Sequence, residues 1–262
     1  MLEERIDDRA LLRLIGKWLK AGVLDTDGTV HRPETGTPQG GNVSAVLANV
    51  YLHYVLDLWF TKVVQLSSKG GSFLIRYADD WVCGFEDQTD AENFYAKLGE
   101  RLKKFGLELA AEKTRVLRFS REQAPTGDES FEFLGFEFRW GKDRSGKPHV
   151  QRRTSPKKQR KSIERFTDWC KKTRNLRNKA RFAQLHAKLR GYYNYYGLPG
   201  NMESLRAFYY QAMQILRKWL NRRSQMPSYD WPGFIELLKF FPVPPPRIVN
   251  RTRARTPGML IA

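Results

Sequence analysis

The sequence predicts an α+β protein in which β-hairpins and helices share residues 1–153 and helices dominate the rest of the chain. Apolar runs flank a turn within residues 73–85, and apolar and acidic residues alternate along residues 131–138. From residue 156 onward the apolar spacing becomes helical. A length of 262 residues, 41% of them hydrophobic, is enough for a core in one large or two small domains. We place the boundary between two units near residue 153.

The chain is strongly basic, with 46 lysine and arginine residues against 28 acidic ones and a net charge of +18. This balance favours a polyanionic partner, nucleic acid first and an anionic membrane second. The charge is uneven, because residues 139–190 carry 19 basic side chains against 3 acidic ones, a local excess of 19 − 3 = +16. A solvated charged surface is the simplest alternative, but so large an excess would repel itself without a partner.

The composition also bounds the compartment in which the chain acts. Only two cysteines are present, so no disulfide framework is implied and a reducing cytoplasm is expected. The N-terminus is acidic and lacks the apolar core of a secretory signal. No apolar run in the sequence is long enough to span a bilayer.

An amphipathic helix over residues 2–21 is the first predicted element, because its apolar residues recur at helical spacing. We interpret Asp7 and Asp8 as a solvated pair near its first turn, where the helix dipole favours acidic side chains. A polar hairpin or loop is expected to follow, as far as residue 34.

Residues 35–42 (Thr-Gly-Thr-Pro-Gln-Gly-Gly-Asn) form a glycine-rich stretch ahead of a predicted helix over residues 43–58. Pro38 fixes one backbone angle, and the glycines permit turns and the close approach of another molecule. A loop of this kind at a helix N-terminus suits contact with a phosphate or nucleotide. It suits an ordinary turn and helix cap equally well.

Residues 73–85 predict a β-hairpin with Asp79 and Asp80 at or beside its turn. Two adjacent carboxylates repel each other, so something must offset that cost. A divalent cation such as Mg²⁺ is one candidate, because it prefers hard oxygen ligands. A turn that water solvates is the other.

Downstream of the hairpin, the pattern predicts a helix over residues 91–105 and short strands at 107–109 and 116–119. Residues 131–138 are expected to form a strand with a bend or bulge at Leu134-Gly135. A second strand near residues 149–152 is expected to pair with it.

Helices are then predicted over residues 156–172, 182–196 and 201–220, with Asn201 as a possible cap for the last of them. A short helical piece is expected near residues 234–240. The proline-rich tail from residue 242 cannot be helical, and the final residues are expected to be disordered.

Four motifs, in this order, resemble the reverse transcriptase/maturase proteins encoded by bacterial group II introns. The first two, which reverse transcriptases share broadly, are residues 36–52 (with Gly-Thr-Pro-Gln-Gly-Gly leading into Leu-Ala-Asn-Val-Tyr-Leu) and residues 76–80 (Arg-Tyr-Ala-Asp-Asp). The third is residues 133–136 (Phe-Leu-Gly-Phe). The last, residues 189–197 (Leu-Arg-Gly-Tyr-Tyr-Asn-Tyr-Tyr-Gly), resembles the maturase-specific thumb region. The resemblance extends from about residue 1 to residue 250.

The resemblance implies part of a right-hand polymerase palm, an antiparallel sheet with helices, over residues 1–153. An α-helical maturase or thumb bundle would occupy residues 154–241, and a Pro/Arg-rich tail residues 242–262. Asp79 and Asp80 would be catalytic and would bind Mg²⁺, with Mn²⁺ as a possible substitute. Lys113 would be the third catalytic residue, in the motif whose lysine protonates the pyrophosphate leaving group.

The implied partners are group II intron RNA, a template–primer duplex and a dNTP. The residues that would bind the substrates are Pro38, Gln39, Gly40, Tyr77, Phe133, Leu134 and Gly135. The residues that would bind nucleic acid are Arg152, Arg153, Lys157, Lys158, Arg160, Lys161 and Arg190.

The sequence also departs from the family's pattern. Ala45 stands where the family usually has a proline, and we expect no endonuclease domain after the thumb region. The family's fingers and first palm strand, which carries a further metal-binding aspartate, would precede residue 1. The chain therefore resembles a C-terminal part of a reverse transcriptase, and we expect it to be inactive alone. A separately encoded fingers and palm region would be a further partner.

Two alternatives stay open at the level of the sequence. The chain could be a non-enzymatic splicing factor that binds intron RNA, or a decayed remnant of a mobile element.

Overall fold

The computed structural model describes residues 1–20, 43–121, 129–143, 145–223 and 225–249, together with the backbone of residues 23–24 and 30–31. The chain divides into two compact units, Met1–Leu117 and Arg118–Ala262. The boundary predicted near residue 153 lies inside the second unit, between a strand and the helix that comes after it. The assignment of palm, thumb and tail to sequence ranges stays a prediction.

The first unit begins with helix α1 (Arg9–Lys20), which is shorter at its N-terminus than the predicted helix. The Asp8 carboxylate accepts hydrogen bonds from the backbone N–H groups of Ala10 and Leu11, at 2.8 and 3.1 Å. Asp8 therefore caps the helix, in keeping with its structural interpretation. Strands β1 (Val23–Leu24) and β2 (Val30–His31) pair antiparallel where a polar hairpin or loop was predicted.

A long helical stretch comes next, and it changes pitch along its length. It comprises α2 (Ser44–Leu52), the π-helical segments η1 (His53–Asp57) and η2 (Phe60–Val64), and the short α3 (Gln65–Ser67). The sequence predicted a helix here but not its two wider turns. Four apolar side chains of the π segments are buried and contribute to the core of this unit, namely Val55, Leu56, Phe60 and Val64.

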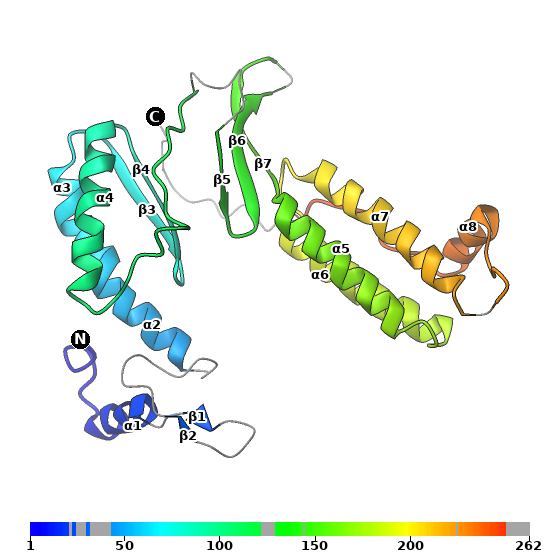
Figure 1. Ribbon diagram of the computed structural model, residues 1–262, viewed down its shortest axis with the longest axis horizontal. Helices are drawn as coiled ribbons and strands as arrows, with labels where there is room; N and C mark the ends of the chain where they lie inside the picture. The colour runs from blue at the N-terminus through cyan, green and yellow to red at the C-terminus, as the bar shows by residue number, and fades with distance from the viewer. Residues whose placement is uncertain are drawn as a thin grey trace. The chain divides into compact units, whose positions relative to one another are not determined.

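Strands β3 (Ser72–Tyr77) and β4 (Asp80–Phe85) form the predicted hairpin, with an antiparallel register from Ser72↔Phe85 to Tyr77↔Asp80. Helix α4 (Gln88–Lys103) lies alongside it (Figure 1). The side chains of Phe94, Leu98 and Leu102 on α4 are buried in the core that Leu74, Trp81 and Phe85 of the hairpin also line.

The two short strands predicted at residues 107–109 and 116–119 are wrong, because both segments are irregular in the structure. The apolar residues of the segment 107–109 have another role. Leu107 and Leu109 pack against the core of the first unit.

The second unit opens with a three-stranded antiparallel sheet made of β5 (Ser130–Phe133), β6 (Phe136–Lys142) and β7 (Pro148–Thr154), in that spatial order. The predicted single strand over residues 131–138 is thus two strands. Leu134 and Gly135 form the turn between them, with φ values of 50° and 80°. Two positive φ angles are typical of the tight turn that joins antiparallel strands, so the glycine marks a hairpin and not a bulge.

The two faces of this sheet differ in character. On one face the rings of Phe131 and Phe138 stack, with their centroids 5.2 Å apart. The Phe119 ring meets the Phe131 ring edge-on and lies tilted against the Trp140 ring. On the other face Glu137 and Arg153 form an ion pair of 2.6 Å. This division follows the alternation of apolar and acidic residues in the sequence.

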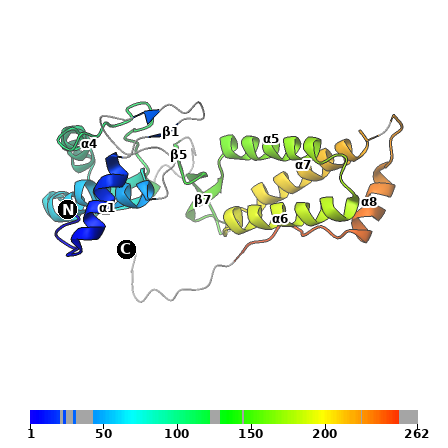
Figure 2. The same cartoon turned by 90° about the horizontal axis from the view of Figure 1, so that it is seen from below.

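The remaining elements are the helices α5 (Pro156–Lys172), α6 (Asn178–Tyr196), α7 (Met202–Leu220) and α8 (Trp231–Phe240), close to the predicted ranges. Figures 1 and 2 show the first three side by side and α8 across their end. Their shared core includes the fully buried side chains of Leu185, Leu189, Tyr193, Leu205, Leu216 and Phe234.

Asn201 precedes α7 as predicted, but its side chain makes no capping hydrogen bond. Its fully buried amide instead accepts a hydrogen bond from the Thr154 N–H at 2.8 Å and donates to the Thr154 hydroxyl and the Tyr196 carbonyl at 2.8 and 2.9 Å. Asn201 therefore ties the end of β7 to the C-terminal end of α6.

The segment after α8 contains no helix through residue 249, as predicted. It packs against α6, where the Tyr193 hydroxyl donates to the Pro244 carbonyl at 3.1 Å. The last residues, where we predicted disorder, lie outside the described part of the chain. Within that described part, no helix combines the length and apolar character needed to cross a membrane.

Candidate active site and nucleic-acid interface

The carboxylate pair sits at the tip of the β3–β4 hairpin. Asp79 is a turn residue, Asp80 begins β4 opposite Tyr77, and all three side chains are exposed. Ala78, the other turn residue, has a φ of 54°, in the left-handed region that disfavours residues with a Cβ. Exposure lets water reduce the repulsion between the two carboxylates, and it also leaves both of them open to a ligand. The solvated turn and the metal site thus both fit this geometry.

A network of hydrogen bonds holds the turn from behind. The Arg76 guanidinium donates to both Asp57 carboxylate oxygens at 2.7 Å, and through Nη1 to Asn49 Oδ1 and the Ala78 carbonyl at 2.8 Å. The hydrogen bond from Arg76 is the main cause that lowers the pKa of Asp57 below its usual value. Sequence reasoning missed Asp57 and Asn49, because no local pattern indicates which side chains of a preceding helix will meet Arg76.

The donor set fits part of a divalent-cation site. Within the described residues, no group of three or more histidine, cysteine or acidic side chains could hold a metal ion. Mg²⁺ is commonly bound through only one or two carboxylates, with waters and substrate phosphates completing its coordination. Asp79 and Asp80 could therefore contribute two carboxylate ligands to a cation that a substrate also binds.

The other predicted residues of the first unit are less informative. Lys113 is exposed in a turn where its N–H donates to the Ala110 carbonyl at 2.9 Å. No hydrogen bond or ion pair between described residues joins its side chain to Asp79 or Asp80. The predicted contacts of Pro38, Gln39 and Gly40 lie outside the described residues.

The predicted substrate-binding turn Phe133-Leu134-Gly135 lies in the second unit, where helices hold it firmly. The Tyr195 hydroxyl donates to the Leu134 carbonyl at 2.9 Å, and the Ser155 N–H donates to the Gly135 carbonyl at 2.9 Å. Phe136, directly after the turn, is buried and stacks on the Tyr195 ring. These contacts support Leu134 in a backbone conformation that is unusual for a bulky residue.

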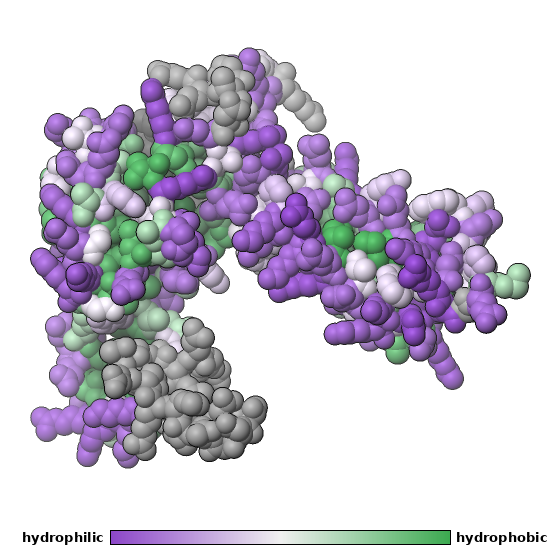
Figure 3. Space-filling model, viewed as in Figure 1, coloured by the Kyte–Doolittle hydropathy of each residue, from purple (hydrophilic) through white to green (hydrophobic). Residues whose placement is uncertain are grey.

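Helix α5 carries much of the basic charge. Ser155 caps it through the Lys158 N–H, and the side chains of Lys157, Lys158, Arg160 and Lys161 are exposed on its first two turns. Figure 3 shows hydrophilic side chains covering much of the helical part of the second unit. Four predicted basic residues are thus accessible to a polyanion on one short stretch of helix.

The other predicted nucleic-acid contacts differ in how far they are already engaged. Arg190 is exposed on α6, and Arg152 donates to the Pro199 carbonyl at 3.1 Å, which leaves its charge uncompensated. Arg153 forms the ion pair with Glu137, so its charge is largely neutralised. Across the described residues of 139–190, Arg153 is the cation that lies within ion-pair distance of a carboxylate.

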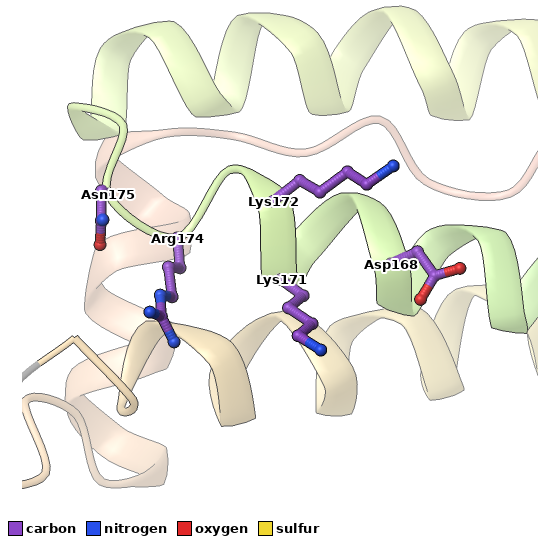
Figure 4. Close-up of a pocket in the computed structure, with 5 residues that line it drawn as sticks. All are labelled: Asp168, Lys171, Lys172, Arg174 and Asn175. Carbon is purple, nitrogen blue, oxygen red and sulfur yellow. The ribbon is translucent and has the colours of Figure 1, made fainter.

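A basic pocket of about 530 Å³ at the C-terminal end of α5 was not singled out from the sequence. Figure 4 shows the side chains that line it, from Asp168, Lys171, Lys172, Arg174 and Asn175. The overall charge excess of residues 139–190 was a signal for these lysines and the arginine. Their grouping in a pocket depends on where α5 ends, which composition does not fix.

Next to this helix end lies a buried arginine that has no carboxylate within ion-pair distance in the described part of the chain. Arg181 is almost fully buried and donates to the carbonyls of Thr173, Arg174 and Leu176. Burial, together with the nearby charge of Arg223, lowers its pKa to about 10. Arg223 donates to the Arg174 and Leu176 carbonyls as well, at 2.8 and 2.9 Å. The two guanidiniums hold the connection between α5 and α6 through its backbone carbonyls, and neither has an acidic partner among the residues that the structure describes.

Comparison with known proteins defines the class. Residues 4–138, which are 135 of the 262 residues, match the family described as reverse transcriptase (RNA-dependent DNA polymerase). The match contains the hairpin with its two exposed carboxylates and the network behind it. The chain belongs to the reverse transcriptase family.

Curated relatives are intron proteins. The group II intron-encoded protein LtrA of Lactococcus lactis is 32% identical over 126 residues, which cover 48% of this chain and 19% of LtrA. The COX1/OXI3 intron 1 protein of Saccharomyces cerevisiae is 38% identical over 69 residues, which cover 26% of this chain and 8% of that protein. The aligned part of this chain spans a fifth or less of the length of each.

Proposed function

We propose that this chain is part of a group II intron reverse transcriptase/maturase, an RNA-directed DNA polymerase that also acts in intron RNA splicing and retrohoming. The observation that carries the proposal is the exposed pair Asp79-Asp80 at the tip of the β3–β4 hairpin, in a chain of the reverse transcriptase family. The similarity to LtrA supports the link to group II introns.

In this proposal Asp79 and Asp80 hold Mg²⁺, or Mn²⁺ in its place, jointly with the phosphates of a dNTP. When bound, the metal activates the primer 3′-hydroxyl and stabilises the charge of the leaving pyrophosphate. Lys113 gives a proton to that leaving group. Tyr77, beside the pair and exposed, contacts the nucleotide or the primer end.

The remaining roles belong to the same proposal. Pro38, Gln39 and Gly40 contact the incoming nucleotide and the template, and the turn Phe133-Leu134-Gly135 supports the primer. Residues 1–153 act as palm, residues 154–241 as thumb, and residues 242–262 as a tail. The exposed cations of α5, together with Arg152, Arg153 and Arg190, bind intron RNA and the template–primer duplex through phosphates.

Primer extension tests the enzymatic part of the proposal. Residues 1–262 are assayed on a template–primer with Mg²⁺ and dNTPs, alone and with a fingers and first-palm-strand segment supplied covalently or as a separate chain. We expect synthesis in the reconstituted form, and we expect Asp80→Ala to abolish it. Synthesis that survives Asp80→Ala would contradict the assignment. Extension by residues 1–262 alone, abolished by Asp80→Ala, would mean that another carboxylate completes the site.

A second candidate function is an intron-RNA-binding splicing factor without polymerase activity. The observation that favours it is the set of exposed cations on the first turns of α5, which have no carboxylate within ion-pair distance among the described residues. Splicing of a group II intron RNA at low Mg²⁺, with and without the chain, separates the two. Stimulation that Asp79→Ala and Asp80→Ala leave intact, without any reconstituted synthesis, supports the splicing factor.

A further inference from the structure

The Arg76 side chain connects the tip of the β3–β4 hairpin to the preceding helix through hydrogen bonds. We propose that Arg76, anchored by Asp57 and Asn49, is a positioning residue that fixes the turn carrying Asp79 and Asp80. The proposal rests on the proposed function only in taking this turn to be the metal-binding site. That Arg76 holds the turn is a separate claim and can be tested separately.

The Arg76 guanidinium contacts two side chains of the preceding helix and one backbone carbonyl of the turn. Its Nε and Nη2 atoms each donate to one oxygen of Asp57 at 2.7 Å, in the planar two-bond arrangement that a guanidinium forms with a carboxylate. Its Nη1 atom donates both to Asn49 Oδ1 and to the Ala78 carbonyl, each at 2.8 Å. Asn49 of α2 and Asp57 of η1, which belong to one continuous helical stretch, therefore meet the hairpin at one side chain.

The π-helical segment η1 allows Asp57 to face Arg76 while neighbouring apolar side chains face the core. A π turn holds about one residue more than an α turn, and that changes the direction of every later side chain by about 100°. Within η1, Val55 and Leu56 are buried in the core while Asp57 binds Arg76. The wider turn thus serves apolar packing and the carboxylate contact together, and π segments are frequent at functional sites.

The carbonyl that Arg76 contacts in the turn belongs to Ala78, whose backbone conformation is strained. Ala78 has a φ of 54°, a conformation that is unfavourable for alanine and persists only where surrounding contacts enforce it. The hydrogen bond from Arg76 Nη1 to its carbonyl is such a contact. The peptide that begins at this carbonyl leads directly into Asp79, so its orientation sets where both carboxylates point.

Lysine at position 76 would keep the positive charge but could not make the two-bond contact and reach the turn at once. Arg76→Lys therefore tests the hydrogen-bonding geometry of the guanidinium and not its charge. Asn49→Ala removes one contact to Nη1 without leaving a charge unpaired, so it covers the case in which Arg76→Lys fails to fold. The matched control is Arg101→Gln, which removes a guanidinium that donates to the Val55 and Tyr54 carbonyls and packs on Phe105. Among the described residues it has no hydrogen bond to the turn or to Arg76.

Amide hydrogen exchange in the full chain, resolved by residue, decides the proposal. We expect exchange at residues 78–81 to accelerate about tenfold in Arg76→Lys and more modestly in Asn49→Ala, with amides of α4 unchanged. Arg101→Gln should leave the turn at its wild-type rate. Wild-type exchange at the turn in both test variants, or the same acceleration in Arg101→Gln, would overturn the proposal.

A Mn²⁺ titration followed by water-proton relaxation provides the readout that a merely structural role would not change. We expect Mn²⁺ affinity to fall about tenfold in Arg76→Lys and to stay at the wild-type value in Arg101→Gln. Unchanged affinity in Arg76→Lys would overturn the claim that Arg76 acts on the carboxylates. A wild-type chain that binds no Mn²⁺ would refute the proposed metal site instead, and hydrogen exchange would then still decide whether Arg76 positions the turn.

Discussion

Replacing Lys157, Lys158, Arg160 and Lys161 together with glutamine should flatten the salt dependence of RNA binding. All four side chains are exposed on the first turns of α5, and no carboxylate of the described chain pairs with them. Each is therefore free to neutralise one phosphate and release its counterions. Binding to structured RNA then loses about 0.7–0.9 in the slope of log K against log salt for each contact removed, or about 3 for all four.

The size of the expected effect makes the assay decisive. A slope of about 3 corresponds to about a 60-fold change in affinity between 50 and 200 mM salt. Over that range wild-type binding should therefore weaken by about 60-fold more than binding by the quadruple variant. Binding isotherms for a structured RNA at four or five salt concentrations measure both slopes, and circular dichroism checks that the helices persist.

A matched control separates a local site from the effect of net charge. Lys62, Lys97, Lys103 and Lys104 are exposed in the first unit, and their replacement by glutamine removes the same charge. The control variant should keep the wild-type slope within about 1. An unchanged slope in the folded α5 variant, or an equal change in the control, would remove α5 from the binding surface. Salt-independent binding by the wild type would refute the nucleic-acid interpretation of the charge.

Three further predictions concern stability. Asn201→Ala should cost about 2–5 kcal/mol in urea unfolding of the second unit, because it leaves the buried N–H and hydroxyl of Thr154 without their partner. A cost below about 1 kcal/mol would contradict the role of the amide. Ala78→Gly should stabilise the first unit by about 0.5 kcal/mol, since glycine relieves the positive φ, and a clear loss of thermal stability would show that the backbone is not strained there. The pairing of Asp57 with Arg76 lowers the pKa of Asp57 in the folded chain, so it stabilises the fold at pH values above the unfolded pKa, near 3.8. This stabilisation is lost as the pH falls through the lower pKa of the folded state. The difference in unfolding free energy between wild type and Asp57→Asn should therefore shrink from pH 5 to pH 3, and a constant difference would refute the linkage.

The elements that the sequence predicted well are those with a strong periodic pattern. Helix α5 was predicted close to its observed bounds, because the apolar spacing becomes helical at Pro156. The hairpin around Asp79 and Asp80 was predicted for the same reason, since two apolar strands enclose a short polar turn. Local chemistry determines such elements almost completely.

The failures have identifiable physical causes. Leu134 with Gly135 resembled a bulge, because alternation continues on both sides of a two-residue turn when the flanking strands pair in register. Leu107 and Leu109 resembled a strand, but their apolar side chains pack on the core without any strand partner. Asn201 resembled a helix cap, although its amide is used in a contact with Thr154, which is 47 residues away in sequence.

The candidate site was predicted in part. The sequence singled out Asp79 and Asp80, but the contacts of Arg76 with Asp57 and Asn49 depend on the two π segments and on how the hairpin packs. No single-sequence pattern signals a π turn. The basic pocket at the end of α5 was missed for a related reason, because charge counting gives the excess of a segment but not its arrangement in space.

The most direct test of the account is whether Asp79 and Asp80 bind a divalent cation. Titrating Mn²⁺ into wild type, Asp79→Asn, Asp80→Asn and the surface control Asp143→Asn, while following water-proton relaxation, measures the site without requiring polymerase activity. We predict a weak site in the wild type and in Asp143→Asn, and we predict that either substitution at the hairpin abolishes it. Identical titration curves for all four proteins would show that the pair is only a solvated turn.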